Sequence, residues 1–164
     1  MKLKPVAIVD TREQRPWRFA HLPAERGTLA TGDYSVRGLE TLVALERKSL
    51  GDLVGCCGRE RTRFVAELQR LRAYRFRAVV VEATLAEIER GGWPGKLTPA
   101  HVLGSIASWQ ARYSPFVFAG DADAAARWAE RYMYQAARAT LESYSAARAL
   151  LEAATPQFAE PALA

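Results

Sequence analysis

The sequence contains few of the residues that build disulfide frameworks or zinc sites. Of its 164 residues, two are Cys and two are His. Cys56 and Cys57 are neighbours, so they cannot cross-link distant parts of the chain. With only His21 and His101 beside them, no spacing typical of a zinc site is present. These shortages exclude a disulfide-rich scaffold and a zinc enzyme, and no pattern places a base beside either thiol to make it a nucleophile.

Long hydrophobic runs are also missing. The longest apolar runs, such as 78–81 and 116–119, are far shorter than a membrane span, so we expect no transmembrane helix. The first five residues carry charge, and no apolar segment typical of a secretory signal follows them. We therefore expect a cytoplasmic protein without a membrane partner.

The charge of the chain is unevenly distributed. The chain has 49% hydrophobic and 25% charged residues, which is typical of one globular domain. Its net charge is +5, but residues 1–77 hold 16 basic and 9 acidic side chains, net +7, whereas residues 78–164 hold 7 and 9, net −2. The first half is therefore the half expected to face an anionic partner.

Hydrophobic patterning predicts an α/β domain. Short apolar runs predict strands at 6–9, 33–36, 41–46, 78–82 and 116–119, and helical spacing predicts helices at 60–74, 84–90, from Thr98 to about 113, and 122–154. Strands 33–36 and 41–46 are expected to form an antiparallel hairpin, and the later strands to be reached through helical crossovers. The segment from the first strand to about Gly27 is expected to be a loop. Residues 155–164 are expected to form a flexible tail.

Acidic residues gather around the first strand and the hairpin. Asp10 and Glu13 follow the first strand, Asp33 stands in Thr31-Gly32-Asp33-Tyr34, and Glu46-Arg47-Lys48 ends the second hairpin strand. Because side chains alternate along a strand, Glu46 and Lys48 point to one face and Arg47 to the other. Pairing of these strands would bring several carboxylates together.

Converging carboxylates repel one another unless a cation lies between them. Oxygen ligands without His or Cys suit Mg²⁺, with Mn²⁺ able to replace it. A lysine beside such a cation can orient the attacking water and offset the charge that develops on a phosphodiester. Each residue alone has an ordinary interpretation, as a loop polar group, a turn residue or a surface ion pair. Together they indicate hydrolysis of a nucleic-acid backbone.

An acidic residue, a hairpin and then Glu-x-Lys is the pattern of the PD-(D/E)xK nuclease superfamily. The longer strings Ile8-Val9-Asp10-Thr11-Arg12-Glu13, Gly32-Asp33-Tyr34 and Glu46-Arg47-Lys48-Ser49-Leu50-Gly51-Asp52-Leu53 resemble the nuclease domain of the XPF-type structure-specific endonucleases. That family's signature is GD, a variable segment and then ERKxxxD. The resemblance covers roughly residues 5–83.

This resemblance implies a restriction-endonuclease-like, three-layer α/β domain, with a central mixed sheet flanked by helices and a long C-terminal helical segment. The domain would span 1–154, with a catalytic core at 5–83 and a helical part at 98–154. The family pattern implies four metal ligands, direct or through water, and four catalytic residues: Asp10, Glu13, Asp33 and Glu46 for the metal, and Asp33, Glu46, Arg47 and Lys48 for catalysis. Asp52 is expected to support the site from the first turn of a helix beginning near Ser49.

Four arginines of the basic half are candidate phosphate contacts, namely Arg12, Arg59, Arg61 and Arg63. Their alternative interpretation is an ordinary solvated surface. We expect a Mg²⁺-dependent DNA endonuclease that acts on flaps, forks or junctions in repair or recombination. If its source is prokaryotic, we expect it to be associated with the nucleoid. The alternatives are a non-catalytic DNA-binding subunit and a nuclease of the same superfamily that cuts plain duplex. Because the chain lacks the helix-hairpin-helix and helicase segments of larger family members, two protein partners stay open: a second copy, and a protein supplying a specificity domain.

Overall fold

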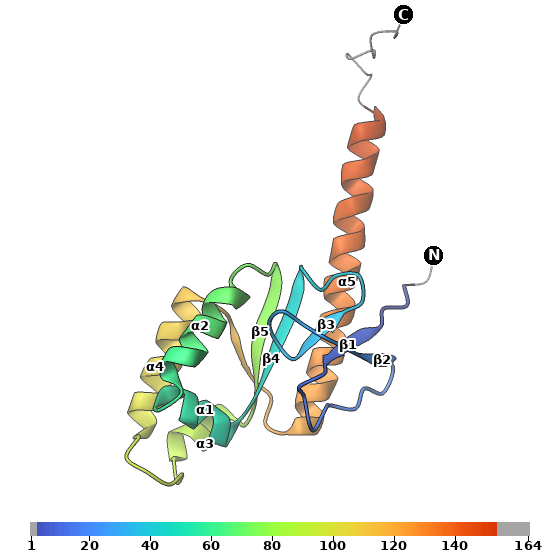
Figure 1. The fold of residues 1–164 in the computed structure, drawn as a ribbon. Coiled ribbons are helices and arrows are strands. Elements are labelled where there is room, and N and C mark those ends of the chain that lie inside the picture. The colour runs from blue at the N-terminus through green and yellow to red at the C-terminus, as the bar shows by residue number, and fades with distance from the viewer. Residues whose placement is uncertain (1–2, 154–164) are drawn as a thin grey trace, which may run out of the picture.

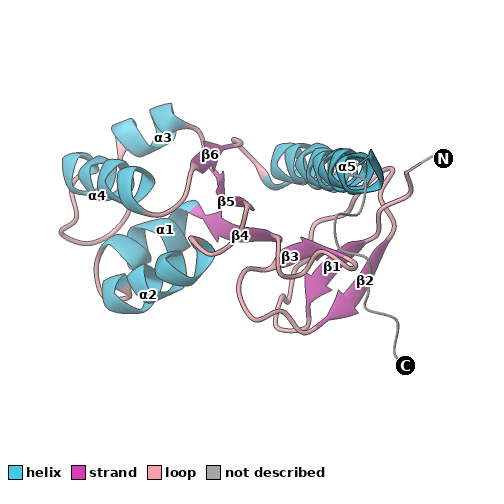
Figure 2. Ribbon diagram, turned by 90° about the horizontal axis from the view of Figure 1, so that it is seen from above, coloured by secondary structure: helices cyan, strands magenta, loops and turns pink. Residues whose placement is uncertain are grey.

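The computed structural model describes residues 3–153, and they form a mixed six-stranded sheet with helices on both faces (Figures 1 and 2). In chain order the elements are β1 (Ala7–Asp10), β2 (Ala24–Gly27), β3 (Tyr34–Val36), β4 (Val43–Ser49), α1 (Leu50–Cys57), α2 (Arg61–Leu71), β5 (Phe76–Glu82), α3 (Leu85–Arg90), α4 (Pro99–Arg112), β6 (Phe116–Phe118) and α5 (Ala122–Ala153). The predicted fold class is confirmed. The predicted tail at 155–164 lies outside the described residues.

The strands lie in the order β2-β1-β3-β4-β5-β6. β1 pairs antiparallel with β3, and β3 pairs antiparallel with β4, so the predicted hairpin is present. β4, β5 and β6 run parallel to one another, as expected of strands joined by helical crossovers. Within the described part of the chain, no helix is long and apolar enough to cross a membrane.

Alternating side chains of the central strands divide the core into two layers. Ala78 and Val80 of β5 pack toward α5. Val79 and Val81 point to the other face, where α1, α2 and α4 cover the sheet and the two cysteines of α1 are buried. Because both faces of β5 are covered at its centre, residues 78–81 form a continuous apolar run.

The predicted helix starts are confirmed by their caps. The hydroxyl of Thr98 accepts a hydrogen bond from the backbone N–H of His101 at 3.3 Å, and Pro99 is the first helical residue of α4. Asp121 accepts the N–H of Ala124 at 2.7 Å and starts α5. Each cap satisfies a backbone donor that the first turn of a helix leaves without a partner.

One strand, β2, was not predicted from the sequence. Residues 24–27 were predicted to be loop, but they form β2, an edge strand parallel to β1. Its sequence, Ala-Glu-Arg-Gly, has alternately exposed and half-buried residues with little apolar character. Backbone hydrogen bonds to β1 hold this strand, so hydrophobic periodicity could not reveal it.

Candidate active site

The strand order brings Asp33, next to the start of β3, beside Glu46 of the neighbouring strand β4. Asp33 directly precedes β3, and its backbone N–H donates to the carbonyl of Leu45 in β4 at 2.8 Å. Gly32 permits this approach, because its φ is +79° and a Cβ there would lie 2.9 Å from the Leu45 carbonyl oxygen. The Gly-Asp pair therefore places the Asp33 carboxyl beside the second half of β4.

Glu46 and Lys48 project from the same face of β4, as the alternation predicted. Glu46 is almost fully buried, at 3% exposure. Its Oε1 forms an ion pair with the Lys48 ammonium, whereas its Oε2 has no hydrogen-bond partner, the only such buried side-chain atom among the residues described. Burial and the nearby charge of Asp33 raise the pKa of Glu46 well above its usual range. This oxygen is an acceptor without a donor.

The Asp33 carboxyl also lies in a negative environment. Burial raises its pKa to about 6, although the backbone N–H of Arg47 donates to its Oδ2 at 2.8 Å and Lys48 is nearby. Glu13 and Glu67 push its pKa in the same direction as burial. Asp33 and Glu46 therefore form a carboxylate pair with too little positive charge around it.

Lys48 is held between two carboxylates and an aromatic ring. Burial alone would lower its pKa, but the Glu46 carboxylate more than offsets this and raises the pKa above its usual range. Its ammonium lies 5.0 Å from the centre of the Phe64 ring and 3.9 Å from Oε2 of Glu67. Lys48 is thus a charged hydrogen-bond donor at neutral pH.

Sequence reasoning missed Glu67, which lies on α2. It stands three residues after Phe64 and one before Leu68, both of which are fully buried. That spacing placed Glu67 beside the inner face of the helix, where a carboxylate is unusual. This mismatch was the signal that could have identified it.

Asp10, a predicted metal ligand, already has partners for both of its oxygens. Arg12 donates to Oδ1 at 2.6 Å and to Oδ2 at 3.2 Å, and the backbone N–H of Leu29 donates to Oδ2 at 2.8 Å. Burial would raise the pKa of Asp10, but these hydrogen bonds outweigh it and lower the pKa to about 2. In this arrangement Asp10 joins two loops.

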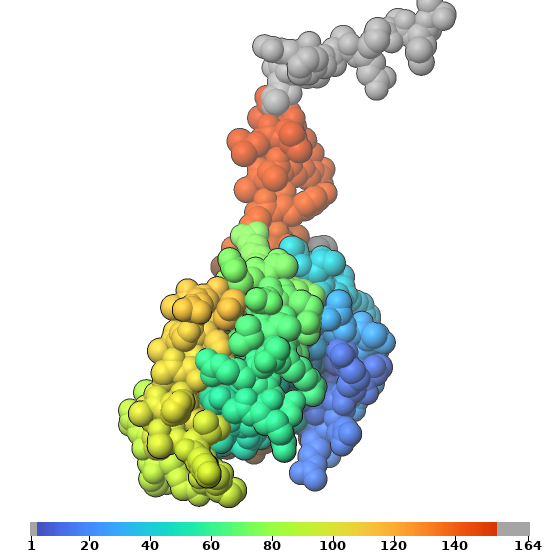
Figure 3. All heavy atoms as spheres, turned by 60° about the vertical axis from the view of Figure 1, so that its left-hand side comes forward, coloured from blue at the N-terminus to red at the C-terminus, as the bar shows by residue number. Residues whose placement is uncertain are grey.

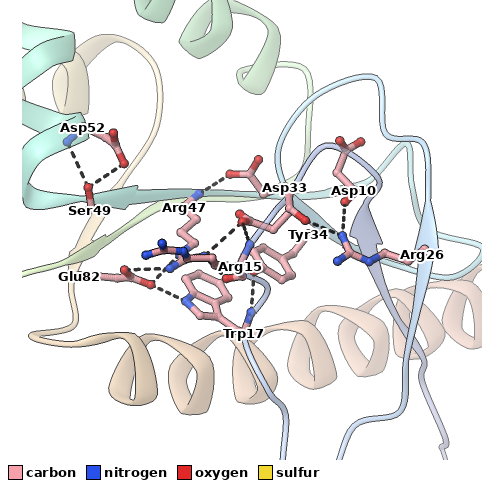
Figure 4. A network of polar contacts seen from close by, with 11 residues as sticks. Asp10, Arg15, Trp17, Arg26, Asp33, Tyr34, Arg47, Ser49, Asp52 and Glu82 are labelled. Atoms are coloured by element: carbon pink, nitrogen blue, oxygen red, sulfur yellow. Dashed lines mark hydrogen bonds and ion pairs between the residues drawn. The ribbon is translucent and has the colours of Figure 1, made fainter.

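Glu13 and Arg47, which were also predicted site residues, belong to a network on the opposite face of β4. Figure 4 shows Arg47 of this network with Glu82, Arg15 and Trp17. Arg47 pairs with Glu82 of β5 at 2.7 Å and with Glu13 at 3.3 Å, and it donates to the carbonyl of Arg15. The indole N–H of Trp17 donates to Glu82 at 2.6 Å. Arg47 therefore fixes the loop after β1 against the sheet.

Asp52 lies in the first turn of α1, three residues after the N-cap Ser49. The hydroxyl of Ser49 accepts the N–H of Asp52 at 3.1 Å and donates to its carboxylate at 2.6 Å (Figure 4). These bonds close the first turn of α1 directly after β4. They fix the start of α1 next to Lys48.

The predicted phosphate-binding arginines divide into two groups. The side chains of Arg12, Arg59 and Arg63 are 70%, 91% and 86% exposed. Arg61 instead donates to the hydroxyl of Ser105 at 2.7 Å and lies 5.1 Å from the centre of the Trp109 ring, so it links α2 to α4. A cleft of about 310 Å³ connects Lys48 and Glu67 with Arg59 and Arg63.

The carboxylate pair fits a divalent cation that keeps part of its water shell. In the described part of the chain, no three His, Cys, Asp or Glu side chains are close enough to hold a metal by themselves. Mg²⁺ commonly binds through one or two carboxylates together with waters. The unpaired Oε2 of Glu46 beside Asp33 supplies such a ligand pair.

Comparison with known proteins agrees with this fold. XPF from Aeropyrum pernix has a similar fold, with a TM-score of 0.61 and 18% identity over 89% of this chain and 70% of that one. XPF from Aeropyrum pernix in complex with DNA gives a TM-score of 0.60 and 18% identity over 85% and 66%. No curated protein matches the sequence. The model of the ERCC4 domain matches residues 9–132, which is most of the chain, and the protein therefore belongs to the ERCC4 domain family.

Proposed function

We propose that this protein is a metal-dependent DNA endonuclease that cuts phosphodiester bonds at flaps, forks or junctions during repair or recombination. The observation that carries the proposal is the pair Asp33 and Glu46, with its unpartnered Oε2, next to a charged Lys48. Membership in the ERCC4 domain family supports a nuclease, and the XPF structure with DNA supports a DNA substrate. We take residues 5–83, which contain all of these groups, as the catalytic core.

Asp33 and Glu46 would hold Mg²⁺, with Mn²⁺ as a substitute. When bound, the cation would lower the pKa of a coordinated water and offset charge on the phosphate. Lys48 would donate a hydrogen bond from Nζ to the water or to a phosphate oxygen, which fixes the line of attack. Hydrolysis breaks one P–O bond and leaves a phosphate on one end and a hydroxyl on the other.

Glu67 would act as a positioning residue for Lys48. The ammonium has Glu46 on one side and Glu67 on the other, so cation binding at Glu46 leaves it a second carboxylate partner. This second partner would keep Lys48 charged and directed into the cleft. Asp10 and Arg47 would act indirectly, since both tie the loop after β1 to the sheet.

The exposed arginines beside the cleft would bind the DNA backbone. Arg59 and Arg63 line the same cleft as Lys48, and Arg12 lies on the loop after β1. Phosphate contacts of this kind position DNA without reading its sequence. Branch selection would then require a second copy of the chain or a separate specificity protein.

A cleavage assay tests this proposal. Labelled single strand, duplex, flap, fork and four-way junction would be incubated with Mg²⁺, Mn²⁺ or EDTA, with Asp33→Asn and Glu46→Gln as variants. We expect metal-dependent cutting of branched DNA that both variants lose while they keep DNA binding. Binding without cutting would instead support a non-catalytic subunit, and equal cutting of plain duplex would support a duplex nuclease.

A further inference from the structure

Two glycines of α1 line the cleft that holds Lys48. Gly51 and Gly55 are four residues apart, so they lie on one face of the helix, and they line the cleft together with Arg59 and Arg63. We call this side of α1 the glycine face. Figure 3 shows this part of the molecule, with α1 and α2 in blue-green and green at the centre. Two positions one turn apart therefore present backbone, without a side chain, to the cleft.

The fold itself requires neither glycine. Neither has a positive φ, so the backbone accepts an ordinary residue at both positions. A Cβ at Gly55 would meet no other described part of the chain within 4 Å, and one at Gly51 would meet only the Ser49 hydroxyl at 3.9 Å. Gly58 is different, because a Cβ there would lie 3.1 Å from the side chain of Leu97. Packing accounts for Gly58 and leaves the glycine face unexplained.

The two glycines also make α1 less stable. Glycine in a helix is less favourable than alanine, because it loses more backbone freedom on folding. α1 has only eight residues, Leu50–Cys57, so two glycines are a large share of it. Glycine at such a position is typical of a backbone that a ligand approaches closely. The cleft in front of the glycine face therefore has the features of a binding surface.

The charges of the cleft suit a phosphate backbone. Each acidic side chain that lines it already has a partner: Asp52 has Ser49, Glu60 has Arg59 and Arg63, and Glu67 has Lys48. The ion pairs of Glu60, at 3.3 and 3.7 Å, join it to arginines that are largely exposed. Exposed pairs of this kind are weak, so both guanidinium groups can turn to a phosphate.

We propose that the sugar–phosphate backbone of the DNA strand to be cut lies against the glycine face of α1 and runs from there to Lys48. This inference rests on the proposed function, because it extends the DNA path from the candidate site. Glu46, which pairs with Lys48, has a buried Oε2 without a partner among the described residues, and this oxygen marks the end of the path where a cation would bind. A volume of about 310 Å³ is at the small end for a ligand site, so the cleft admits part of one strand rather than a double helix.

Substitution of Gly55 tests the path, because it should separate stability from cleavage. Gly55→Ala should raise the melting temperature by about 2 °C and lower kcat/KM for branched DNA about tenfold, since the new methyl group stands where the strand passes. Gly55→Met, with a longer side chain that also favours a helix, should lower kcat/KM at least about a hundredfold. A lower melting temperature of Gly55→Ala would show that the fold needs this glycine and would overturn the inference.

Gly104→Ala is the matched control. Gly104 lies inside α4, outside this cleft, and a Cβ there would also meet no other described part of the chain within 4 Å. We expect the same gain in melting temperature with unchanged cleavage. Equal cleavage by Gly55→Ala and the unmodified protein would overturn this inference alone. An unmodified protein that neither binds nor cuts DNA would overturn the proposed function together with it.

Chemical protection locates the strand without cleavage. Gly51→Cys and Gly104→Cys each place one thiol at an exposed position, whereas both native cysteines are buried. In the Asp33→Asn background, saturating branched DNA should slow alkylation of Gly51→Cys at least about tenfold and leave that of Gly104→Cys unchanged. Alkylation of Gly51→Cys at the same rate with and without DNA would overturn the proposed path.

Discussion

The two faces of β4 carry opposite kinds of charge arrangement. On one face, Arg47 is surrounded by Glu82, Glu13 and the Arg15 carbonyl, so each charge there has a partner. On the other, Asp33 and Glu46 share one ammonium, and an oxygen of Glu46 has no partner. A saturated network holds structure together, whereas an unsaturated buried carboxylate pair is prepared for a cation. In the consecutive residues Glu46, Arg47 and Lys48, the middle one therefore holds the scaffold together, whereas the outer two belong to the candidate site.

The largest expected effect comes from the unsaturated face. Glu46→Gln removes a charge that has too few partners, so the fold should persist while cleavage falls by at least about 100-fold. Cleavage rate and circular dichroism, measured together, check both halves of this expectation. Unchanged cleavage would remove Glu46 from the site.

Breaking the saturated face should affect stability instead. Arg47→Ala leaves Glu82 and Glu13 without their cation in a half-buried position and should cost about 3 kcal/mol of unfolding free energy. The exposed pair Arg37 and Glu25 is the control, where Arg37→Ala should cost less than about 1 kcal/mol. Urea unfolding measures both, and equal losses would contradict the assignment of Arg47 to the scaffold.

The pH dependence of the metal-free protein sharpens the same contrast. Because the pKa of Asp33 rises to about 6 on folding, its contribution to stability is full below pH 3.8 and is lost as pH rises through 6. Asp10, with a pKa of about 2, contributes above pH 3.8 and loses this only as pH falls toward 2. We expect a stability loss of about 2 kcal/mol from Asp33 between pH 4 and 7.

Asp33→Asn should remove the share of the loss that comes from Asp33 and leave the share of the buried Glu46 carboxyl, whose pKa is also raised, as urea unfolding at pH 4 and pH 7 would show. Mg²⁺ should raise the melting temperature of the unmodified protein at pH 7 and leave that of Asp33→Asn unchanged. Identical pH profiles of the two proteins would show that Asp33 is not strained by its surroundings.

The arginines before and at the start of α2 offer a smaller contrast. Arg59→Ala with Arg63→Ala should weaken DNA binding about tenfold and reduce its salt dependence, with stability unchanged. Arg61→Ala should instead lower the melting temperature and leave DNA binding and its salt dependence unchanged, because it breaks the link to Ser105 and Trp109. Binding titrations at several salt concentrations and thermal melts separate the two. If Arg61→Ala alone reduced the salt slope, the division between these residues would be wrong.

The smallest effect is expected at Glu67. Glu67→Gln should lower kcat about threefold to tenfold with KM unchanged, since it loosens Lys48 and leaves Arg59 and Arg63 of the same cleft in place. Glu60→Gln, in the same cleft but paired with Arg59 and Arg63, is the control and should leave kcat unchanged. A change in KM alone would assign Glu67 to binding.

Much of this architecture was predictable from local signals. The caps at Thr98 and Asp121, the hairpin, and the shared face of Glu46 and Lys48 all follow from short-range rules, and the structure confirms them. The roles of the predicted site residues stay predictions. The features that could not be predicted from the sequence depend on contacts between distant parts of the chain. β2 has no apolar pattern, Glu67 and Lys48 lie far apart in the chain, and the Arg61 link joins two helices.

The two adjacent cysteines of α1 have a practical consequence. Burial raises the pKa of both thiols to about 11, so neither is a thiolate at neutral pH. Alkylating and oxidising reagents should therefore leave the folded protein intact. A cysteine introduced on the exposed end of α5 would be the reactive thiol of the described structure, ready for a spin label or a fluorophore without prior removal of the native pair.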